Sequence, residues 1–258
     1  PGIDGGDVNP MVPNDLDGRS RPLDADGDGI ATHDMGAYES DTAGALQCGF
    51  TLSSSAGVAP LTVTMTAHAA GTNAEMNYCW WDITGQLPQE DINSAPYQGA
   101  GLTALTVVYD TPGVYSIALQ VQNTFGELAY YLRPTVLTVY PRTNYVWAGN
   151  TAPVIPYDSL AKAATNIQDA IDMAGEGTVV LVTNDTYSLE RDLVLYQGVT
   201  LRPTPPASMP ILSHNVATQQ NRVVTLLHPN AVLDGFIITN GYMWNGAYPY
   251  DRGGGVFM

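Results

Sequence analysis

The sequence predicts a mainly β protein in which a two-layer β-sandwich precedes stacked short strands that begin under a helix. Three observations lead to this prediction. Apolar and polar residues alternate with period two over residues 46–141. Apolar residues then recur at helical spacing over residues 159–174. After that helix, short β-prone runs follow at intervals of roughly 20 residues or more, without tight hairpin signals between them.

The negative net charge limits which partners the chain is expected to bind. The chain has 258 residues, a formal net charge of −16 and a single lysine, Lys162. Neutralising phosphates needs a basic face, so no nucleic acid and no anionic membrane surface is expected as a partner, whereas divalent cations suit this composition. No apolar run is long enough to span a bilayer, so we expect no membrane insertion.

The pattern along the chain separates three parts, at residues 1–43, 44–141 and 142–258. The first part is rich in Asp, Gly and Pro and shows little periodicity. No charged start followed by an apolar stretch opens the sequence, as a signal peptide would require. We interpret the chain as a segment of a longer polypeptide.

The middle part is predicted to hold about seven short strands, as an immunoglobulin-like sandwich does. Hydrophobic alternation favours strands at residues 49–52, 61–67, 77–82, 103–108, 113–123 and 128–139. Three motifs resemble the PKD family, a sandwich module of secreted and surface proteins: TPGVY at 111–115, NTFG at 123–126 and WDITG at 81–85. The last motif keeps only Trp and Asp of the family's WDFGDG signature. We therefore interpret Trp81 as a core aromatic residue.

The last part is predicted to start with one helix over residues 159–174, capped by Asp158 or Ser159 and ended by Gly175. Strands are expected at 178–182, 193–195, 199–201, 223–226, 232–233 and 236–239. A helix followed by stacked short strands fits the helical cap and first coils of a right-handed parallel β-helix.

Several segments of this last part resemble the pectate-lyase-like β-helix proteins, and most of all the choice-of-anchor type of bacterial surface protein: TNIQDAI at 165–171, GTVVLV at 177–182, GVTL at 198–201 and LDGFIITNG at 233–241. Residues 15–18 and 34–39 resemble the closing segment of the same group. The resemblance implies one β-helix that ends at about residue 43, a sandwich, and a second β-helix that begins at residue 142. It also implies export to the cell surface.

A calcium loop is predicted in the first part. Asp24, Asp26 and Asp28 alternate before Gly29, as in the first half of an EF-hand-like loop, and the backbone carbonyl of Ile30 supplies a further oxygen. Asp34 falls one position short of the usual bidentate acid. The alternative is a solvated acidic turn without a metal.

Two further features are candidate sites. Cys48 and Cys79 both fall in the sandwich, where an exported domain favours a disulfide, and two buried thiols are the alternative. An aromatic loop could stack on sugar rings or simply cover the adjoining strands; it contains Tyr242, Trp244, Tyr248 and Tyr250.

No catalytic residue is predicted. The carboxylates of Asp185, Glu190, Asp192 and Asp234 are candidates only because β-helix scaffolds host glycosidases and lyases. The first hypothesis is therefore a non-catalytic structural or adhesive segment whose partners are surface proteins, further copies of the chain in head-to-tail assembly, or polysaccharide. The alternative is part of a polysaccharide-degrading enzyme whose active site lies later or outside this chain.

Overall fold

The computed structural model describes residues 21, 45–71, 74–205, 209–214, 222–242 and 254–258. Within these residues the chain is mainly β, and none of the described helices is both long and apolar enough to cross a membrane. Two compact units divide the chain. The first runs up to residue 53 and adds 64–106 and 115–136, and the second contains 54–63, 107–114 and 137–258. The predicted domain boundaries stay predictions.

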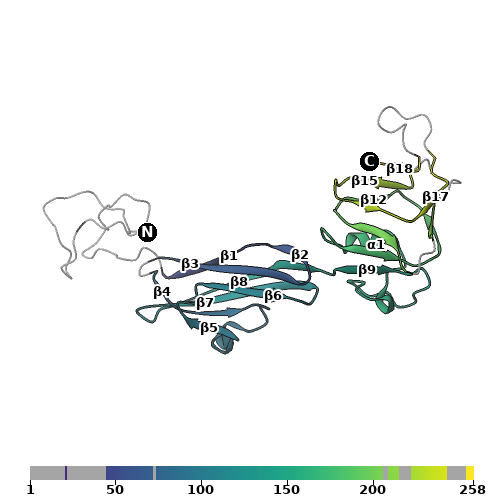
Figure 1. Ribbon diagram of the computed structural model, residues 1–258. Helices are drawn as coiled ribbons and strands as arrows, with labels where there is room; N and C mark the ends of the chain where they lie inside the picture. Colours follow the sequence, from purple (N-terminus) through teal and green to yellow (C-terminus); the bar gives the residue numbers. More distant parts are fainter. Residues whose placement is uncertain (1–20, 22–44, 72–73, 206–208, 215–221, 243–253) are drawn as a thin grey trace. The chain divides into compact units, whose positions relative to one another are not determined.

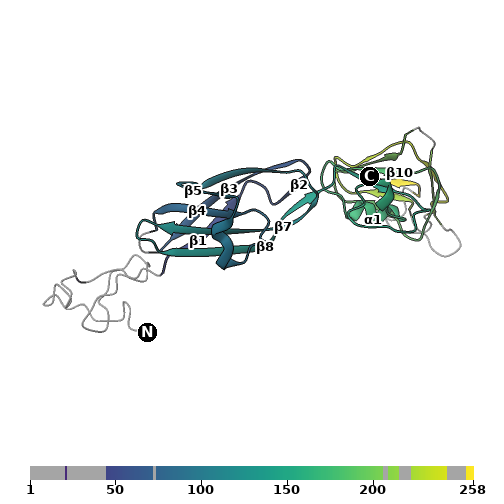
Figure 2. The same cartoon turned by 90° about the horizontal axis from the view of Figure 1, so that it is seen from below.

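The strands up to residue 140 form two sheets (Figures 1 and 2). The first sheet has the order β1 (Gln47–Leu52), β3 (Leu61–Ala70), β6 (Ala104–Tyr109). The second has the order β2 (Ala56–Val58), β8 (Leu128–Tyr140), β7 (Gly113–Asn123), β4 (Met76–Asp82), β5 (Tyr97–Ala100). β1 is antiparallel to β3, and β4 is antiparallel to both β5 and β7, whereas β2 joins β8 in parallel. A 3-10 helix, η1 (Gln89–Ser94), follows β4.

The two sheets pack face to face, so we call this region the sandwich. Phe50 of β1 meets Trp81 of β4 edge to face, with ring centroids 5.7 Å apart. Trp81 is fully buried, and its indole N–H donates to the carbonyl of Leu102 at 3.0 Å. The interpretation of Trp81 as a core aromatic residue is confirmed. All six predicted strands are present, while β2 and β5 were missed because neither alternates.

The chain after residue 142 forms three further sheets, and we call this region the coil. The first sheet has the order β9 (Thr143–Val146), β10 (Val179–Val182), β13 (Thr200–Pro203), β16 (Val232–Leu233). The second contains β11 (Thr186–Leu189), β14 (Ile211–His214) and β17 (Ile237–Thr239), and the third β12 (Leu193–Leu195), β15 (Val224–Leu226) and β18 (Val256–Phe257). From β10 onward each strand up to β15 pairs in parallel with the strand three places later. The chain therefore returns to the same sheet after every three strands.

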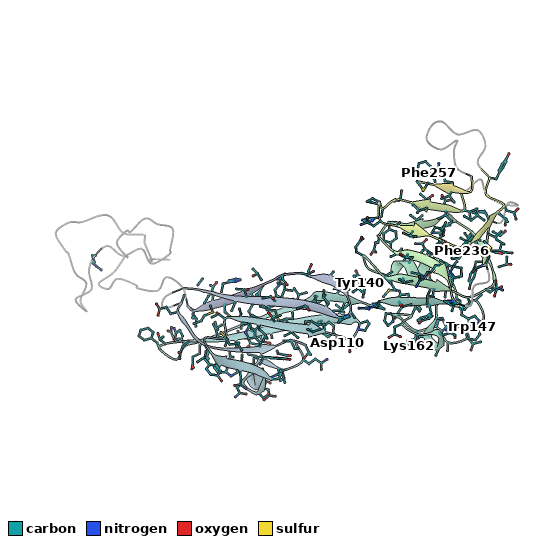
Figure 3. All side chains as sticks on the ribbon, viewed as in Figure 1. Asp110, Tyr140, Trp147, Lys162, Phe236 and Phe257 are labelled. Atoms are coloured by element: carbon teal, nitrogen blue, oxygen red, sulfur yellow. The ribbon has the colours of Figure 1, made fainter. Side chains whose placement is uncertain are left out.

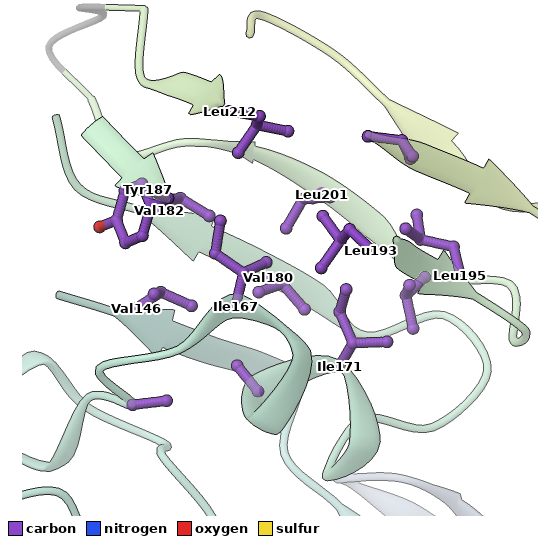
Figure 4. Packing of buried hydrophobic residues seen from close by; sticks show 14 of the residues in the cluster. Val146, Ile167, Ile171, Val180, Val182, Tyr187, Leu193, Leu195, Leu201 and Leu212 are labelled. Atoms are coloured by element: carbon purple, nitrogen blue, oxygen red, sulfur yellow. The ribbon is translucent and has the colours of Figure 1, made fainter. Parts of the chain in front are cut away.

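Side chains from all three sheets fill the inside of the coil. Ile167 and Ile171 of the helix α1 (Ile167–Asp172) point at the strands in Figure 4, and both are at most 1% exposed. The strands contribute a continuous apolar cluster: Val146, Val180, Val182, Tyr187, Leu189, Leu193, Leu195, Leu201, Leu212, Val224. Thus α1 closes the apolar interior where the first turn has no preceding turn to pack on.

The predicted helix over residues 159–174 was wrong in extent. The structure has a 3-10 turn, η2 (Leu160–Lys162), and then the short α1. Between them Ala164 pairs with β9: its N–H donates to the carbonyl of Tyr145, and its own carbonyl accepts from the N–H of Trp147, the residue after β9. This pairing uses the backbone groups that a continuous helix would need. Asn166, rather than Asp158 or Ser159, caps α1, because its side chain accepts from the N–H of Gln168 at 2.8 Å.

Candidate binding groove

A groove of about 790 Å³ lies at the start of the coil. One side is formed by α1 and the residues before it, and the other by β11, β12 and the turn between them. Its lining comprises residues 148, 165–169, 172 and 186–194. These segments are remote in sequence, and the groove exists because α1 lies beside the first strands of two sheets.

Local structure decides which side chains reach the groove. In α1 the side chains of Ile167 and Ile171 turn into the core, so the period of 3.6 leaves Asp169 and Asp172 exposed. In β11 the burial alternates: Tyr187 and Leu189 are buried, and the intervening Ser188 is exposed. The groove therefore exposes polar side chains, and buried apolar side chains lie beneath them.

The charge in the groove is mostly negative. Four of the residues that line it are carboxylates, and one is a cation: Asp169, Asp172, Glu190, Asp192 and Arg191. Hydrogen bonds fix two of the carboxylates. Asp172 accepts from the side-chain amide of Gln168 at 2.8 Å and from the hydroxyl of Tyr196 at 2.9 Å. Asp192 accepts from the hydroxyl of Thr225 at 3.1 Å. Such a wall suits cationic groups and hydroxyl donors.

Burial raises the pKa of two tyrosines beside the groove. For Tyr196 the bond to Asp172 and the charge of that carboxylate raise the pKa further. For Tyr187 burial again raises the pKa most, and a hydrogen bond with Thr183 lowers it in part. Both phenols therefore stay neutral at physiological pH and act as hydrogen-bonding groups.

The predicted carboxylates fall in different places. Glu190 and Asp192 line the groove, whereas Asp185 lies just before β11 and accepts from the N–H of Thr186 at 2.7 Å. Asp234 is exposed in the turn after β16, where Gly235 has a φ of +79°. Asp169 and Asp172 were missed as groove residues, because sequence spacing cannot show that α1 lines the same groove as β11 and β12.

Asp82, the acid retained from the PKD signature, stabilises the turn that follows β4. Its carboxylate accepts from the N–H groups of Leu87 at 2.8 Å and Thr84 at 2.9 Å, and from the Thr84 hydroxyl at 2.7 Å. Burial raises the pKa of Asp82, but these hydrogen bonds outweigh it and hold the pKa below its usual value. The hydrogen bonds of the Asp82 carboxylate therefore have a structural role within its own turn, and none of them indicates a ligand.

Cys48 and Cys79 are both thiols in the structure. The Sγ of Cys48 lies 3.8 Å from the carbonyl of Leu119 on the opposite sheet. The pKa of each thiol is raised to about 11, chiefly by burial; for Cys48 a backbone hydrogen bond with Val121 offsets part of the rise and the nearby Cys79 adds to it. The disulfide between them stays a prediction.

The remaining predicted sites fall largely outside the described residues. Asp24, Asp26, Asp28, Ile30 and Asp34 all lie there, so the calcium loop is untested. In the part of the chain that is described, no group of three or more His, Cys, Asp or Glu residues could hold a metal ion. Of the aromatic loop only Tyr242 is described, and it is 48% exposed; Trp244, Tyr248 and Tyr250 are not.

Comparison with known proteins adds two solved structures. No family model matches the chain, and no curated protein matches it. One similar structure is described as "Structural basis for the promiscuous specificity of the carbohydrate-binding modules from the beta-sandwich super family". It is 20% identical, with a TM-score of 0.32, over 43% of this chain and 39% of that one.

The second similar structure is the PKD1 domain of Vibrio anguillarum Epp. It is 19% identical, with a TM-score of 0.27, over 37% of this chain and 96% of that domain. This chain thus spans well under half of the first structure and nearly all of the second, and neither likeness assigns it a family.

Proposed function

We propose that the chain is a non-catalytic structural and adhesive segment of a large secreted or cell-surface bacterial protein. In this proposal the sandwich is a PKD-like spacer or interaction module, and the coil is the beginning of a right-handed parallel β-helix. The succession of parallel pairings at every third strand supports the β-helix, because a crossover between parallel strands is right-handed in nearly all proteins.

The observation that carries the adhesive role is the groove at the start of the coil. It is wide, open to solvent and lined by hydrogen-bonding groups, of which two carboxylates are already fixed by neighbouring side chains. Such a lining can bind and orient a partner through hydrogen bonds and charge. Polysaccharide and surface proteins are both suited to it.

A turnover experiment tests the non-catalytic part. The chain is incubated with neutral and acidic polysaccharides, and released reducing ends and unsaturated products are measured. We expect no product above the level of a heat-denatured control. Product formation that disappears in Glu190→Gln would establish the alternative, a polysaccharide-degrading enzyme, for which the groove carboxylates Glu190 and Asp192 are the supporting observation.

The assembly part concerns the far end of the coil. Phe236 and Phe257 lie toward the end of the coil opposite Trp147 and Lys162 (Figure 3). An apolar hollow of about 530 Å³ lies there, lined by residues that include Leu226, Leu233, Phe236, Val256 and Met258. A further copy of the chain, packing head to tail on this face, would bury it. Light scattering at increasing concentration should show association, and a strictly monomeric chain would remove this part.

The calcium part rests on the spacing of the carboxylates in the sequence. Calcium added to the metal-free chain should raise the melting temperature, and Asp26→Ala and Asp28→Ala should abolish the rise. A wild-type melting temperature that calcium leaves unchanged would refute it.

A further inference from the structure

The three sheets of the coil begin with β9, β11 and β12, and each of these strands has an outer edge with no strand before it. Other groups of the chain cover two of these three edges. At β9, Tyr145 donates to the carbonyl of Tyr157, while Ala164 donates to the carbonyl of Tyr145 and accepts from the N–H of Trp147. At β12, the side chain of Gln168 replaces a missing strand: its Oε1 accepts from the N–H of Val194 at 2.8 Å, and its Nε2 donates to the Val194 carbonyl at 3.1 Å. The fold thus satisfies these two edges with its own groups.

The outer edge of β11 is different. Ile211 of β14 donates to the carbonyl of Asp185 at 2.9 Å, so in a parallel ladder the backbone groups of Tyr187 and Leu189 also face β14. Those of Thr186 and Ser188 then face the groove. The N–H of Thr186 is taken by Asp185. Among the described residues, no hydrogen bond joins the backbone of Ser188 or the carbonyl of Thr186 to a neighbour on this side.

An unpaired strand edge can recruit a further strand, and natural proteins usually blunt or cover such edges. Thr186 and Ser188 of this edge also line the groove, together with residues of α1 and of the turn after β11. An extended segment in that position would pair with Ser188 and present alternate side chains to the two walls.

The charged residues that line the groove indicate which kind of peptide segment would bind there. Four carboxylates surround a single arginine, so Lys or Arg at alternate positions of an added strand would face opposite charges. The chain itself has nine Lys and Arg against 25 Asp and Glu, so a second copy is a poor source of such a strand. We propose that the groove binds an extended cationic peptide of another protein, as a strand added to the edge of β11. This deepens the proposed adhesive role and rests on it.

The test uses the whole chain and a synthetic peptide of alternating Lys and Thr, with a peptide of alternating Glu and Thr as the matched control. Calorimetry should show saturable binding of the Lys peptide that weakens as salt rises, and none of the Glu peptide. Hydrogen exchange at the Ser188 amide should slow when the Lys peptide is bound. Absence of binding, or equal binding of both peptides, would overturn the inference.

Two variants separate strand addition from simple charge attraction. Ser188→Pro removes the outward N–H and leaves the inward ladder of Tyr187 and Leu189, so it should weaken binding by about tenfold or more. Ser188→Ala keeps the N–H and should bind like the wild type. If the proline variant misfolds by circular dichroism, Glu190→Gln together with Asp169→Asn should lower affinity and flatten the salt dependence. Unchanged affinity in a folded Ser188→Pro overturns the proposal.

A neutral oligosaccharide that displaces the Lys peptide, or that binds while the peptide does not, would assign the groove to sugar instead. Polysaccharide turnover would refute the non-catalytic function without bearing on peptide binding, so the two failures are distinguishable.

Discussion

The sandwich and the coil bury apolar side chains in different ways. In the sandwich, long strands of two sheets face each other, and Phe50 of one sheet meets Trp81 of the other. In the coil, each short strand pairs with the strand of the next turn in the same sheet, so Val180 pairs with Leu201 and Leu201 with Leu233. Each turn of the coil is therefore stabilised by its immediate neighbours, whereas the sandwich core depends on both sheets at once.

The largest expected effect is in the sandwich. Trp81→Ala removes a fully buried indole together with its bond to Leu102 and should lower the free energy of unfolding by about 3–5 kcal/mol. Denaturant titration followed by circular dichroism measures the change. Trp147→Ala is the matched control, because Trp147 is 42% exposed and its loss should cost little. Equal effects of the two variants would contradict a core role for Trp81.

A core substitution in the coil should cost somewhat less. Leu201→Ala removes a buried side chain that has paired neighbours on both sides, and we expect a loss of about 3 kcal/mol. Leu227→Ala is the control, since Leu227 is 61% exposed. Hydrogen exchange should become faster in the strands of the coil and stay unchanged in β3 and β7. Faster exchange spread evenly over both regions would show that they do not differ in this way.

The side chain of Gln168, which covers the outer edge of β12, should contribute still less to the free energy of unfolding. Gln168→Ala leaves the N–H and carbonyl of Val194 without their partner, for an expected loss of about 1–2 kcal/mol. In the sandwich, Gln122→Ala removes only a long bond to Gly126, at 3.4 Å, and should be nearly neutral. If Gln168→Ala proved as mild as the control, α1 would not act as a strand substitute.

The sequence predicts the sandwich better than the coil for a physical reason. The strand over residues 113–123 is eleven residues long, and Ile117, Leu119 and Val121 place an apolar side chain at every second position, so the strand was bounded correctly from sequence. β11 and β14 alternate for only four residues each, the shortest span over which alternation predicts a strand. They were missed, and with them the groove.

The helix shows the opposite failure. Ala163 and Ala164 fit a helical period and are buried, but Ala164 is buried by pairing with β9. Periodicity reports that a residue is buried and leaves open which backbone partner buries it. Asp169 and Asp172 could be placed on the exposed face of the helix from sequence, yet it depends on tertiary packing that they line the same groove as Glu190.

The smallest expected effect is a pH dependence confined to the sandwich. Because the pKa of Asp82 is lowered on folding, its contribution to stability is present above the ordinary pKa of an aspartate and is lost as pH falls through the lower, folded value. Asp82→Asn should therefore destabilise the sandwich at neutral pH and reduce its acid dependence below about pH 4. Unfolding midpoints across that range measure it; an unaltered pH profile would contradict the role given to the carboxylate.

The register of the coil is the claim on which the other conclusions about this region depend, and cross-linking tests it most directly. In a Cys48→Ala, Cys79→Ala background, Thr200→Cys and Val232→Cys occupy paired positions on neighbouring parallel strands. Their Cα atoms should lie about 5 Å apart, within the range of a disulfide. Mild oxidation should link this pair readily, and the pair shifted by two residues, Thr200→Cys with Asp234→Cys, much more slowly. Failure of the first pair to link, or equal rates for both, would contradict the stacked parallel turns.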